Sequence, residues 1–342
     1  MKYVWGILAA LLVIAGALTL RPDLIPGFDN VALSTPMAHL IAVRPWLFIA
    51  FMATALFLLL FSLIRYKLVG AGRIALAVGL IYLAMAIFHG GTVYARGIQN
   101  PAQLGPDRGI TSAGTGNGAI TVLTYNTLGG SIDEEALADA IQNNGVDVVV
   151  LTETATARGT EMTGRLATRG LQFQQFDTGT DEYATEFEST VVLVSTSMGE
   201  YVQVPSAAGL PSSVTVVSAT GHGPKIVAVH PFAPTLEGID RWRTDIDSIY
   251  ALCSDSGPFI LAGDFNSTVD HQMVVGGACK DGAIEAGSGG LGTWPTRIPN
   301  LLGTPIDRVL HDGAFEGIDA MQFESGDTDH RGLIVRLAPA GD

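Results

Sequence analysis

The sequence is poor in basic residues. Its 342 residues include 19 Lys and Arg against 33 Asp and Glu, which gives a formal net charge of −14 at pH 7. The first 95 residues carry six cations and only two acids, so the remaining residues carry a net charge of −18. Tight binding to duplex nucleic acid normally depends on Lys and Arg side chains that neutralise phosphates. This charge balance therefore argues against nucleic acid as a partner.

Charged residues are absent from three apolar runs. Tyr3–Leu20, Trp46–Ile64 and Ile74–Tyr94 contain no Asp, Glu, Lys or Arg. Each run is close to the ~20 apolar residues needed to cross the hydrocarbon layer of a membrane. We therefore predict three transmembrane helices within residues 1–95. The first run also has the pattern of a signal peptide, because Lys2 precedes it and small residues stand at positions 15–17, and this alternative stays open.

The link between the second and third runs sets the expected orientation. Residues 65–73 hold three cations and no acid. Short loops rich in Lys and Arg stay on the cytoplasmic side of a membrane. Counting runs from this link places the N-terminus in the cytoplasm and everything after Tyr94 outside it. We therefore predict a multi-pass protein of the cell membrane with an extracytoplasmic C-terminal domain.

The composition changes after the third run. Residues 96–119 are rich in Gly, Pro, Ser and Thr without an apolar period, which predicts a flexible linker before a domain over residues 120–342. The predicted strands are Ile120–Tyr125, Val146–Leu151, Thr190–Val194, Val214–Ala219, Lys225–Val229, Phe259–Leu261, Ile306–Leu310 and Leu333–Leu337. The predicted helices are Asp133–Asn143 and Leu236–Cys253, the second with Asp245 and Asp247 on its solvent face. Many strands with few helices favour an α+β sandwich of two sheets over a single parallel sheet.

The chain has only two cysteines, Cys253 and Cys279, and both lie in this domain. In an oxidising compartment such a pair is expected to form a disulfide. Two buried free thiols are the alternative.

A polar pair stands at the end of a predicted buried strand, in the segment Leu261–Ser267. Residues two apart on an extended backbone face the same way, so Asp264 and Asn266 are predicted to converge on one spot. Gly263 would let the backbone approach a bound group. An Asx-rich turn that caps the next helix is the alternative interpretation.

Further polar side chains follow or precede other predicted strands. They are Asn126, Glu153, His230, Asp307 and the pair Asp329-His330. A carboxylate such as Glu153 at the end of a buried run is costly unless it is bound, and Mg²⁺ takes oxygen ligands of this kind. Each residue alone fits a cap, a turn or a core histidine, but five such sites in order at strand ends favour one shared site.

Together these segments resemble a known family. Thr124–Asn126, Thr152–Thr154, Val229–Pro231, Gly263–Asn266, Ile306–Arg308 and Thr328–His330 follow the order of motifs in the endonuclease/exonuclease/phosphatase superfamily of metal-dependent phosphoesterases. The resemblance covers Ile120 to Leu337 and implies a four-layer αββα sandwich. With three preceding apolar runs, the chain is also similar to bacterial membrane-anchored members associated with glycopeptide resistance.

Two segments depart from the family pattern. Glu188–Val192 stands where the family often has a Gly-containing segment, so the residue that would support His230 cannot be placed. Asp307-Arg308 stands where the family often has Asp-His.

The resemblance implies a metal site. Glu153 would be the principal ligand of Mg²⁺ or Mn²⁺, with Asn126 nearby, and Asp329 would complete the site or its surroundings. A cation there would neutralise charge on phosphate oxygens.

The resemblance also implies catalytic roles. His330, oriented by Asp307, would be the general base or a phosphate-stabilising group. Asp264 would position or deprotonate the attacking water, and Asn266 would donate to a phosphate oxygen. His230 would hydrogen-bond the phosphate or protonate the leaving group. Trp294, which lies between two motifs, is interpreted as a core or rim aromatic residue, with contact to the substrate as the alternative.

These expectations lead to one principal hypothesis about function. We predict a membrane-anchored phosphoesterase that hydrolyses a phosphodiester, phosphomonoester or pyrophosphate in a lipid or lipid-linked cell-envelope substrate. Anchoring would raise the effective concentration of a membrane-bound substrate. An extracytoplasmic nuclease or nucleotide phosphatase is one alternative, and a non-catalytic membrane-tethered binding protein is another.

Overall fold

The computed structural model describes residues 2–106, 118–180, 188–255 and 257–341. The chain divides into two compact units, residues 1–95 and 96–342. Each unit is described below by itself.

The first unit is helical. Its long helices are α1 (Lys2–Ala17), α4 (Arg44–Val69) and α5 (Arg73–Ala95), and its short ones are η1 (Pro22–Leu24), α2 (Asp29–Ala32) and α3 (Met37–Ala42). By length and composition, α4 and α5 could cross a membrane, and only a minority of their side chains are buried, unlike those of a core helix in a soluble protein. Helix α1 has 16 residues and is shorter than a span requires. Within the described residues the structure therefore shows two helices of membrane-spanning character, where the sequence predicts three.

The second unit contains two mixed sheets of six strands each. In spatial order the first sheet is β11 (Phe315–Phe323), β12 (Gly332–Pro339), β1 (Ile120–Asn126), β2 (Val148–Thr152), β4 (Thr190–Ser195) and β3 (Phe173–Asp177). The second sheet is β5 (Tyr201–Val204), β6 (Val214–Ser218), β7 (Lys225–Val229), β8 (Phe259–Asp264), β10 (Asp307–His311) and β9 (Lys280–Asp281). Each sheet has one parallel pair at its centre, β1 with β2 and β7 with β8, and its other pairs are antiparallel.

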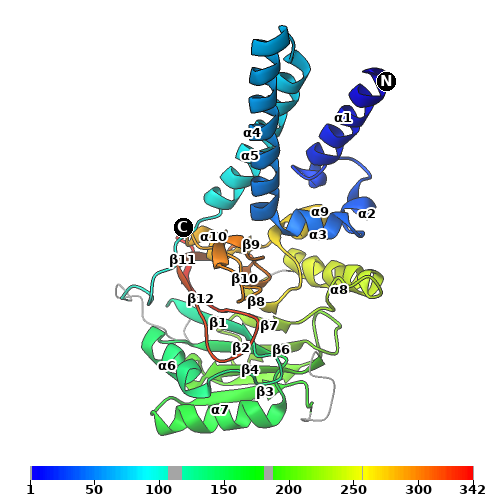
Figure 1. The fold of residues 1–342 in the computed structure, drawn as a ribbon. Coiled ribbons are helices and arrows are strands. Elements are labelled where there is room, and N and C mark those ends of the chain that lie inside the picture. Colours follow the sequence, from blue (N-terminus) through cyan, green and yellow to red (C-terminus); the bar gives the residue numbers. More distant parts are fainter. Residues whose placement is uncertain (1, 107–117, 181–187, 256, 342) are drawn as a thin grey trace. The chain divides into compact units, whose positions relative to one another are not determined.

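The sheets pack face to face and helices cover their outer faces. Side chains such as Val122 and Ala262 form the core between the sheets. Because successive side chains of a strand alternate, Leu123 points to the other face and packs with Leu137 and Met162 of the helices outside the first sheet. These helices are α6 (Glu134–Asn144) and α7 (Thr156–Thr168) (Figure 1).

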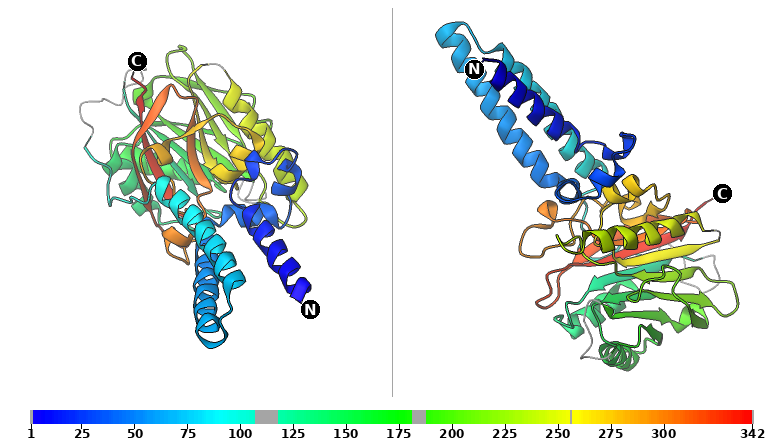
Figure 2. Two further views of the ribbon diagram at one scale, coloured as in Figure 1. Left: turned by 90° about the horizontal axis from the view of Figure 1, so that it is seen from above. Right: turned by 90° about the vertical axis from the view of Figure 1, so that its right-hand side faces the viewer.

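The outer face of the second sheet is covered by α8 (Ile239–Ala251), with α9 (Val269–Val275) and α10 (Gly282–Glu285) beyond it in the chain (Figure 2). Tyr250 of α8 stacks on Phe265, which follows β8. The domain is thus an α+β sandwich of two sheets with helices outside, as the sequence predicts.

Each strand predicted from an apolar run corresponds to a strand of the structure, and β7, Lys225–Val229, has the predicted bounds. Helix α7 and the strands β3, β5, β9 and β11 were not predicted. The reason is local sequence: β3 is Phe-Gln-Gln-Phe-Asp at a sheet edge, and α7 contains two glycines and four threonines, which have low helix propensity.

The prediction that Asp245 lies on the solvent face of its helix is wrong. Asp245 is buried, and its Oδ2 accepts a hydrogen bond from the backbone N–H of Phe232 at 3.0 Å. The loop that follows β7 lies against this side of α8 and satisfies the carboxylate. Asp247 is exposed, as predicted.

The start of the expected linker is bound to the domain. Both guanidinium ends of Arg96 donate to the carboxylate of Asp270, at 2.8 and 2.7 Å. The backbone of Gln99 donates to Gly287 O, and Leu104 is buried. Residues 96–106 are therefore not a flexible linker, because they have partners far along the chain that composition cannot reveal. Residues 107–117 lie outside the described part of the chain.

Cys253 and Cys279 form a disulfide bond. It joins the short turn η4 (Leu252–Ser254), which follows α8, to the segment before β9.

Candidate active site

Polar residues from both sheets meet because of the strand order. Asn126 ends β1, and Glu153 follows β2, which is parallel to β1. His230 follows β7, and Asp264 ends β8, which is parallel to β7. The carboxyl ends of parallel neighbours lie at the same edge of a sheet, so each sheet contributes two of these side chains.

The other two side chains come from antiparallel strands that begin at this edge. Asp307 is the first residue of β10 and lies directly opposite Asp264 in the β8–β10 register. His330 stands two residues before β12, which is antiparallel to β1. Six residues from six separate segments are thereby brought to one place.

The amide of Asn126 bridges two carboxylates from different sheets. Its Nδ2 lies 2.8 Å from Oε1 of Glu153 and 3.1 Å from Oδ2 of Asp264. Its Oδ1 accepts a hydrogen bond from the backbone N–H of Leu128 at 3.0 Å, which fixes the orientation of the amide. Asn126 therefore presents donors to the cluster, whereas a metal ligand would have to present its oxygen.

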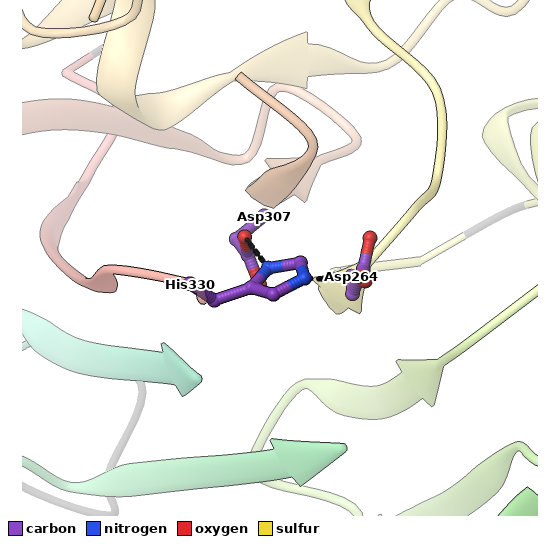
Figure 3. A group of neighbouring side chains, drawn as sticks. All are labelled: Asp264, Asp307 and His330. Carbon is purple, nitrogen blue, oxygen red and sulfur yellow. Dashed lines mark hydrogen bonds and ion pairs between the residues drawn. The ribbon is translucent and has the colours of Figure 1, made fainter. Parts of the chain in front are cut away.

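His330 lies between two buried aspartates (Figure 3). Its Nδ1 is hydrogen-bonded to Oδ2 of Asp307 at 2.8 Å, and its Nε2 is 3.7 Å from Oδ2 of Asp264. Ligand atoms of these three residues lie within 4.8 Å of one another, close enough to hold a metal ion.

The electrostatics of this group favour an imidazolium. Burial lowers the pKa of His330, but the charges of Asp307 and Asp264 and the hydrogen bond to Asp307 outweigh burial and raise this pKa to about 10. Burial also raises the pKa of Asp307, with the charge of Asp264 adding to it and His330 opposing it. The surrounding charges therefore favour the protonated form of His330, which donates from Nδ1 to Asp307.

His230 completes the cluster from the second sheet. Its Nε2 lies 3.6 Å from Oε1 of Glu153 and 3.8 Å from Oδ2 of Asp264. Within the described residues, the buried Nδ1 of His230 and the buried Oδ1 of Asp307 have no hydrogen-bond partner in the protein. Buried polar atoms without partners are costly, so a bound group that supplied a partner to either atom would be favoured.

Asn266 and Asp329 lie at the edge of the cluster. Nδ2 of Asn266 donates to Pro231 O at 3.0 Å, the carbonyl of the residue that follows His230. The side chain of Asp329 is 47% exposed; its Oδ1 is 3.9 Å from Nε2 of His330, and its Oδ2 accepts from Nε1 of Trp294 at 2.8 Å.

The segment after β8 forms the Asx turn and helix cap that were the alternative interpretation of its sequence. Oδ1 of Asp264 accepts from the backbone N–H of Asn266 at 2.8 Å, which makes an Asx turn, and Thr268 caps α9. The expectation for Gly263 is wrong. A Cβ there would lie 1.9 Å from Val229 O, so this glycine allows β8 to approach β7 and not a bound group.

Backbone strain is concentrated at this site. Among the described residues, the non-glycine residues with positive φ are Leu128 (48°), Glu153 (52°) and Asn266 (45°). Such conformations are uncommon for residues with a side chain and gather at functional sites. Glu153 is a site residue that follows a strand of the first sheet. Leu128 is hydrogen-bonded to Asn126, and Asn266 closes the Asp264 turn.

The donor set suits a hard divalent cation. Glu153, Asp264 and Asp307 supply carboxylate oxygens at a largely buried position, and such oxygens are the ligands that Mg²⁺ and Mn²⁺ take. Nδ1 of His330 is already bound to Asp307, so only its Nε2 is available to a ligand. The candidate positions for a cation are therefore beside the partly exposed carboxylate of Glu153 and within the group Asp264, Asp307 and His330.

Two threonines that the sequence did not single out hold the site residues in place. Oγ1 of Thr328 donates to Asn126 O at 2.9 Å and accepts from the N–H of His330 at 3.2 Å. Oγ1 of Thr293 accepts from the N–H of Asp307 at 3.0 Å. Thr328 directly precedes Asp329, and Thr293 directly precedes Trp294. Threonine is too common in loops for such a position to identify a residue that supports the site.

The sequence model of the Endonuclease/Exonuclease/phosphatase family matches residues 123–330. The chain belongs to this family. Its matched region includes all six residues of the cluster, and membership supports a phosphoester hydrolase. No curated protein sequence matches the chain.

Solved structures are similar to part of this chain. A TDP2 of D. rerio, humanized by 14 mutations, has a TM-score of 0.50 and 16% identity, and the match covers 64% of this chain and 98% of that one. An endonuclease/exonuclease/phosphatase from Beutenbergia cavernae DSM 12333 has a TM-score of 0.48 and 18% identity, with 65% of this chain and 72% of that one covered.

Proposed function

We propose that this protein is a membrane-anchored, metal-dependent phosphoesterase that acts outside the cytoplasm. Its substrate would be a phosphodiester, phosphomonoester or pyrophosphate in a lipid or lipid-linked cell-envelope molecule. The observation that carries the proposal is the Asp307–His330 pair facing Asp264, with Glu153 joined to the same cluster through Asn126.

The residues divide the work of hydrolysis as follows. Glu153 would hold the cation with Asp264 close by, and a bound Mg²⁺ or Mn²⁺ supplies positive charge to the phosphate oxygens. The imidazolium of His330, oriented by Asp307, donates its Nε2–H to a phosphate oxygen and stabilises the charge that develops there. Of the two roles expected for His330, the raised pKa favours this one over general base.

The remaining roles fall to groups next to Asp264. The Asp264 carboxylate orients the attacking water and takes its proton as the oxygen bonds to phosphorus. His230 lies within 3.8 Å of this carboxylate and would protonate the leaving oxygen as its bond to phosphorus breaks. Asn266 uses one amide N–H on Pro231 and keeps the other for a phosphate oxygen.

Three features support a membrane substrate. Helices α4 and α5 have the length and composition of membrane spans, and contacts within the second unit begin at Arg96, directly after α5, so the segment that joins the spans to the domain is short. The loops that leave the site strands β1 and β7 expose Leu128 (40%) and Leu236 (78%), and an apolar chain attached to phosphate would cover such side chains.

Two features support an extracytoplasmic domain. The link between α4 and α5 carries the cations of Arg65, Lys67 and Arg73, and the domain contains a disulfide, which persists in oxidising compartments. The similarity to glycopeptide-resistance-associated members stays a prediction.

The experiment is a substrate panel with the full-length protein in detergent. Phospholipid vesicles, a polyprenyl pyrophosphate, nucleotides and single-stranded DNA are offered with Mg²⁺ and then with a chelator, to wild type, Glu153→Gln and the surface control Asp255→Asn. We expect chelator-sensitive release of phosphate or headgroup from a lipid substrate by wild type and the control only. Faster turnover of nucleotide or DNA would show that the substrate is not a lipid. No turnover of any substrate would favour a tethered binding protein.

A further inference from the structure

The residue after His330 organises a separate loop. Arg331 is 4% exposed, and its guanidinium points at main-chain carbonyls of residues 292–298, the segment we call the Trp294 loop. Its Nη1 donates to Pro295 O at 3.1 Å, and its Nη2 donates to Thr296 O at 3.0 Å and to Ile298 O at 2.7 Å. One side chain thus gathers the carbonyl groups of three residues of this loop.

A lysine could not replace this arrangement. Among the residues that the structure describes, the one carboxylate that Arg331 contacts is Glu324, which Nε reaches at 2.7 Å and which is itself 59% exposed. Most of the compensation for burying this cation therefore comes from the loop carbonyls. The planar guanidinium offers five N–H groups in a fixed fork, whereas an ammonium offers three on a flexible stem.

The Trp294 loop contacts both sides of the His330 environment. On one side, Oγ1 of Thr293 accepts from the N–H of Asp307 at 3.0 Å. On the other, Nε1 of Trp294 donates to Oδ2 of Asp329 at 2.8 Å. The N–H of Arg331 also donates to Thr293 O at 2.8 Å, so the loop is joined to the His330 segment by backbone as well as side chain.

We propose that Arg331 is a positioning residue, which holds the Trp294 loop so that Asp307 and Asp329 stay aligned on the two sides of His330. This inference rests on the proposed function and extends it to a residue that does not touch the reacting atoms. Its loss would let Trp294 leave Asp329 and would loosen the orientation of the Asp307–His330 pair.

The chain contains a matched control. Arg336 lies five residues later in the chain, within β12, is also buried, and also donates to carbonyls, Gly105 O at 2.6 Å and Asn144 O at 3.3 Å. These partners are outside the cluster of site residues. A general effect of losing a buried arginine should appear equally in Arg331→Gln and Arg336→Gln.

The test measures tryptophan quenching by acrylamide and steady-state turnover in full-length protein. The signal of Trp294 is taken as the difference between each variant and the same variant carrying Trp294→Phe. We expect Arg331→Gln to increase quenching of Trp294 and to lower kcat about 10- to 100-fold, because displacement of about 1 Å at a site can cost that much. Arg331→Lys should remain impaired, and Arg336→Gln should change neither reading.

Several outcomes would overturn the proposal. They are unchanged Trp294 quenching in both Arg331 variants, full activity of Arg331→Lys, or equal loss of kcat in Arg331→Gln and Arg336→Gln. If Arg331→Gln does not fold, the two readings are taken on Arg331→Lys alone. The quenching result does not need turnover, so failure of the proposed function and failure of this inference remain distinguishable.

Discussion

Nδ1 of His330 lies 2.8 Å from Oδ2 of Asp307, although the two residues are 23 positions apart. The contact forms because β10 begins and β12 begins at the same edge of the sandwich, each beside a strand that ends there. It gives the buried imidazole a fixed orientation and a counter-charge.

Replacing Asp307 by Asn should remove the counter-charge and keep the volume. We expect kcat to fall by about 10² or more, because an oriented acid–base or charge-stabilising group contributes roughly 10²–10⁴. Steady-state turnover of a phosphodiester checks this. The control is Asp255→Asn, whose carboxylate is paired with Lys225 on the surface. Wild-type turnover by Asp307→Asn would remove the pair from the mechanism.

The raised pKa of His330 should make stability depend on pH. Burial lowers this pKa, but the charges of Asp307 and Asp264 raise it to about 10, above the ordinary value near 6.5. A group whose pKa is higher in the folded state stabilises that state fully below its ordinary pKa, and the stabilisation is lost as pH rises through the folded value. Thermal unfolding of the full chain with chelator should therefore show a Tm that falls between about pH 7 and pH 10.

The histidine's share of this effect is isolated by His330→Gln. Its Tm should fall less over the same pH range than that of wild type. Parallel curves for the two proteins would show that His330 does not carry the raised pKa.

Substituting Gly263 should test whether β7 and β8 approach each other closely at this residue. The φ of Gly263 is 150°, and a Cβ would lie 1.9 Å from Val229 O, which is backbone and cannot move aside. We expect Gly263→Ala to lower the free energy of unfolding by about 3 kcal/mol or more. Urea unfolding measures this.

Gly164, in α7, serves as the control for this substitution, since a Cβ there meets open space. Gly164→Ala should be neutral or stabilise by up to about 1 kcal/mol. Equal behaviour of the two variants would contradict the close approach of the strands.

The elements that could be predicted from sequence were those with a local signal. Apolar runs such as Lys225–Val229 identified buried strands, and acids before Leu137 identified the start of α6. Strand β3 and helix α7 were missed because tertiary packing stabilises them against weak local preference. The buried position of Asp245 likewise depends on a loop that begins more than ten residues earlier.

The features of the candidate site likewise fall into those that could be predicted from the sequence and those that could not. That Asn126, Glu153, His230, Asp264, Asp307 and His330 would share one site was predicted from their order at strand ends, while their catalytic and metal-binding roles remain predictions. The direction of the Asn126 amide, the function of Gly263 and the contacts of Arg96 and Arg331 could not be predicted. Each depends on an atom contributed by a distant segment, and no local pattern records it.

The central claim is that this buried acidic cluster is a metal-dependent centre of phosphoester hydrolysis. The most direct test is the turnover of bis(4-nitrophenyl) phosphate by the full-length protein in Mg²⁺, after chelation, and after Mg²⁺ is restored, for wild type and His330→Gln. We predict turnover by wild type that disappears with the chelator and returns with Mg²⁺, and a loss of about 10² or more in His330→Gln. Turnover that survives chelation, or equal turnover by His330→Gln, would contradict the account.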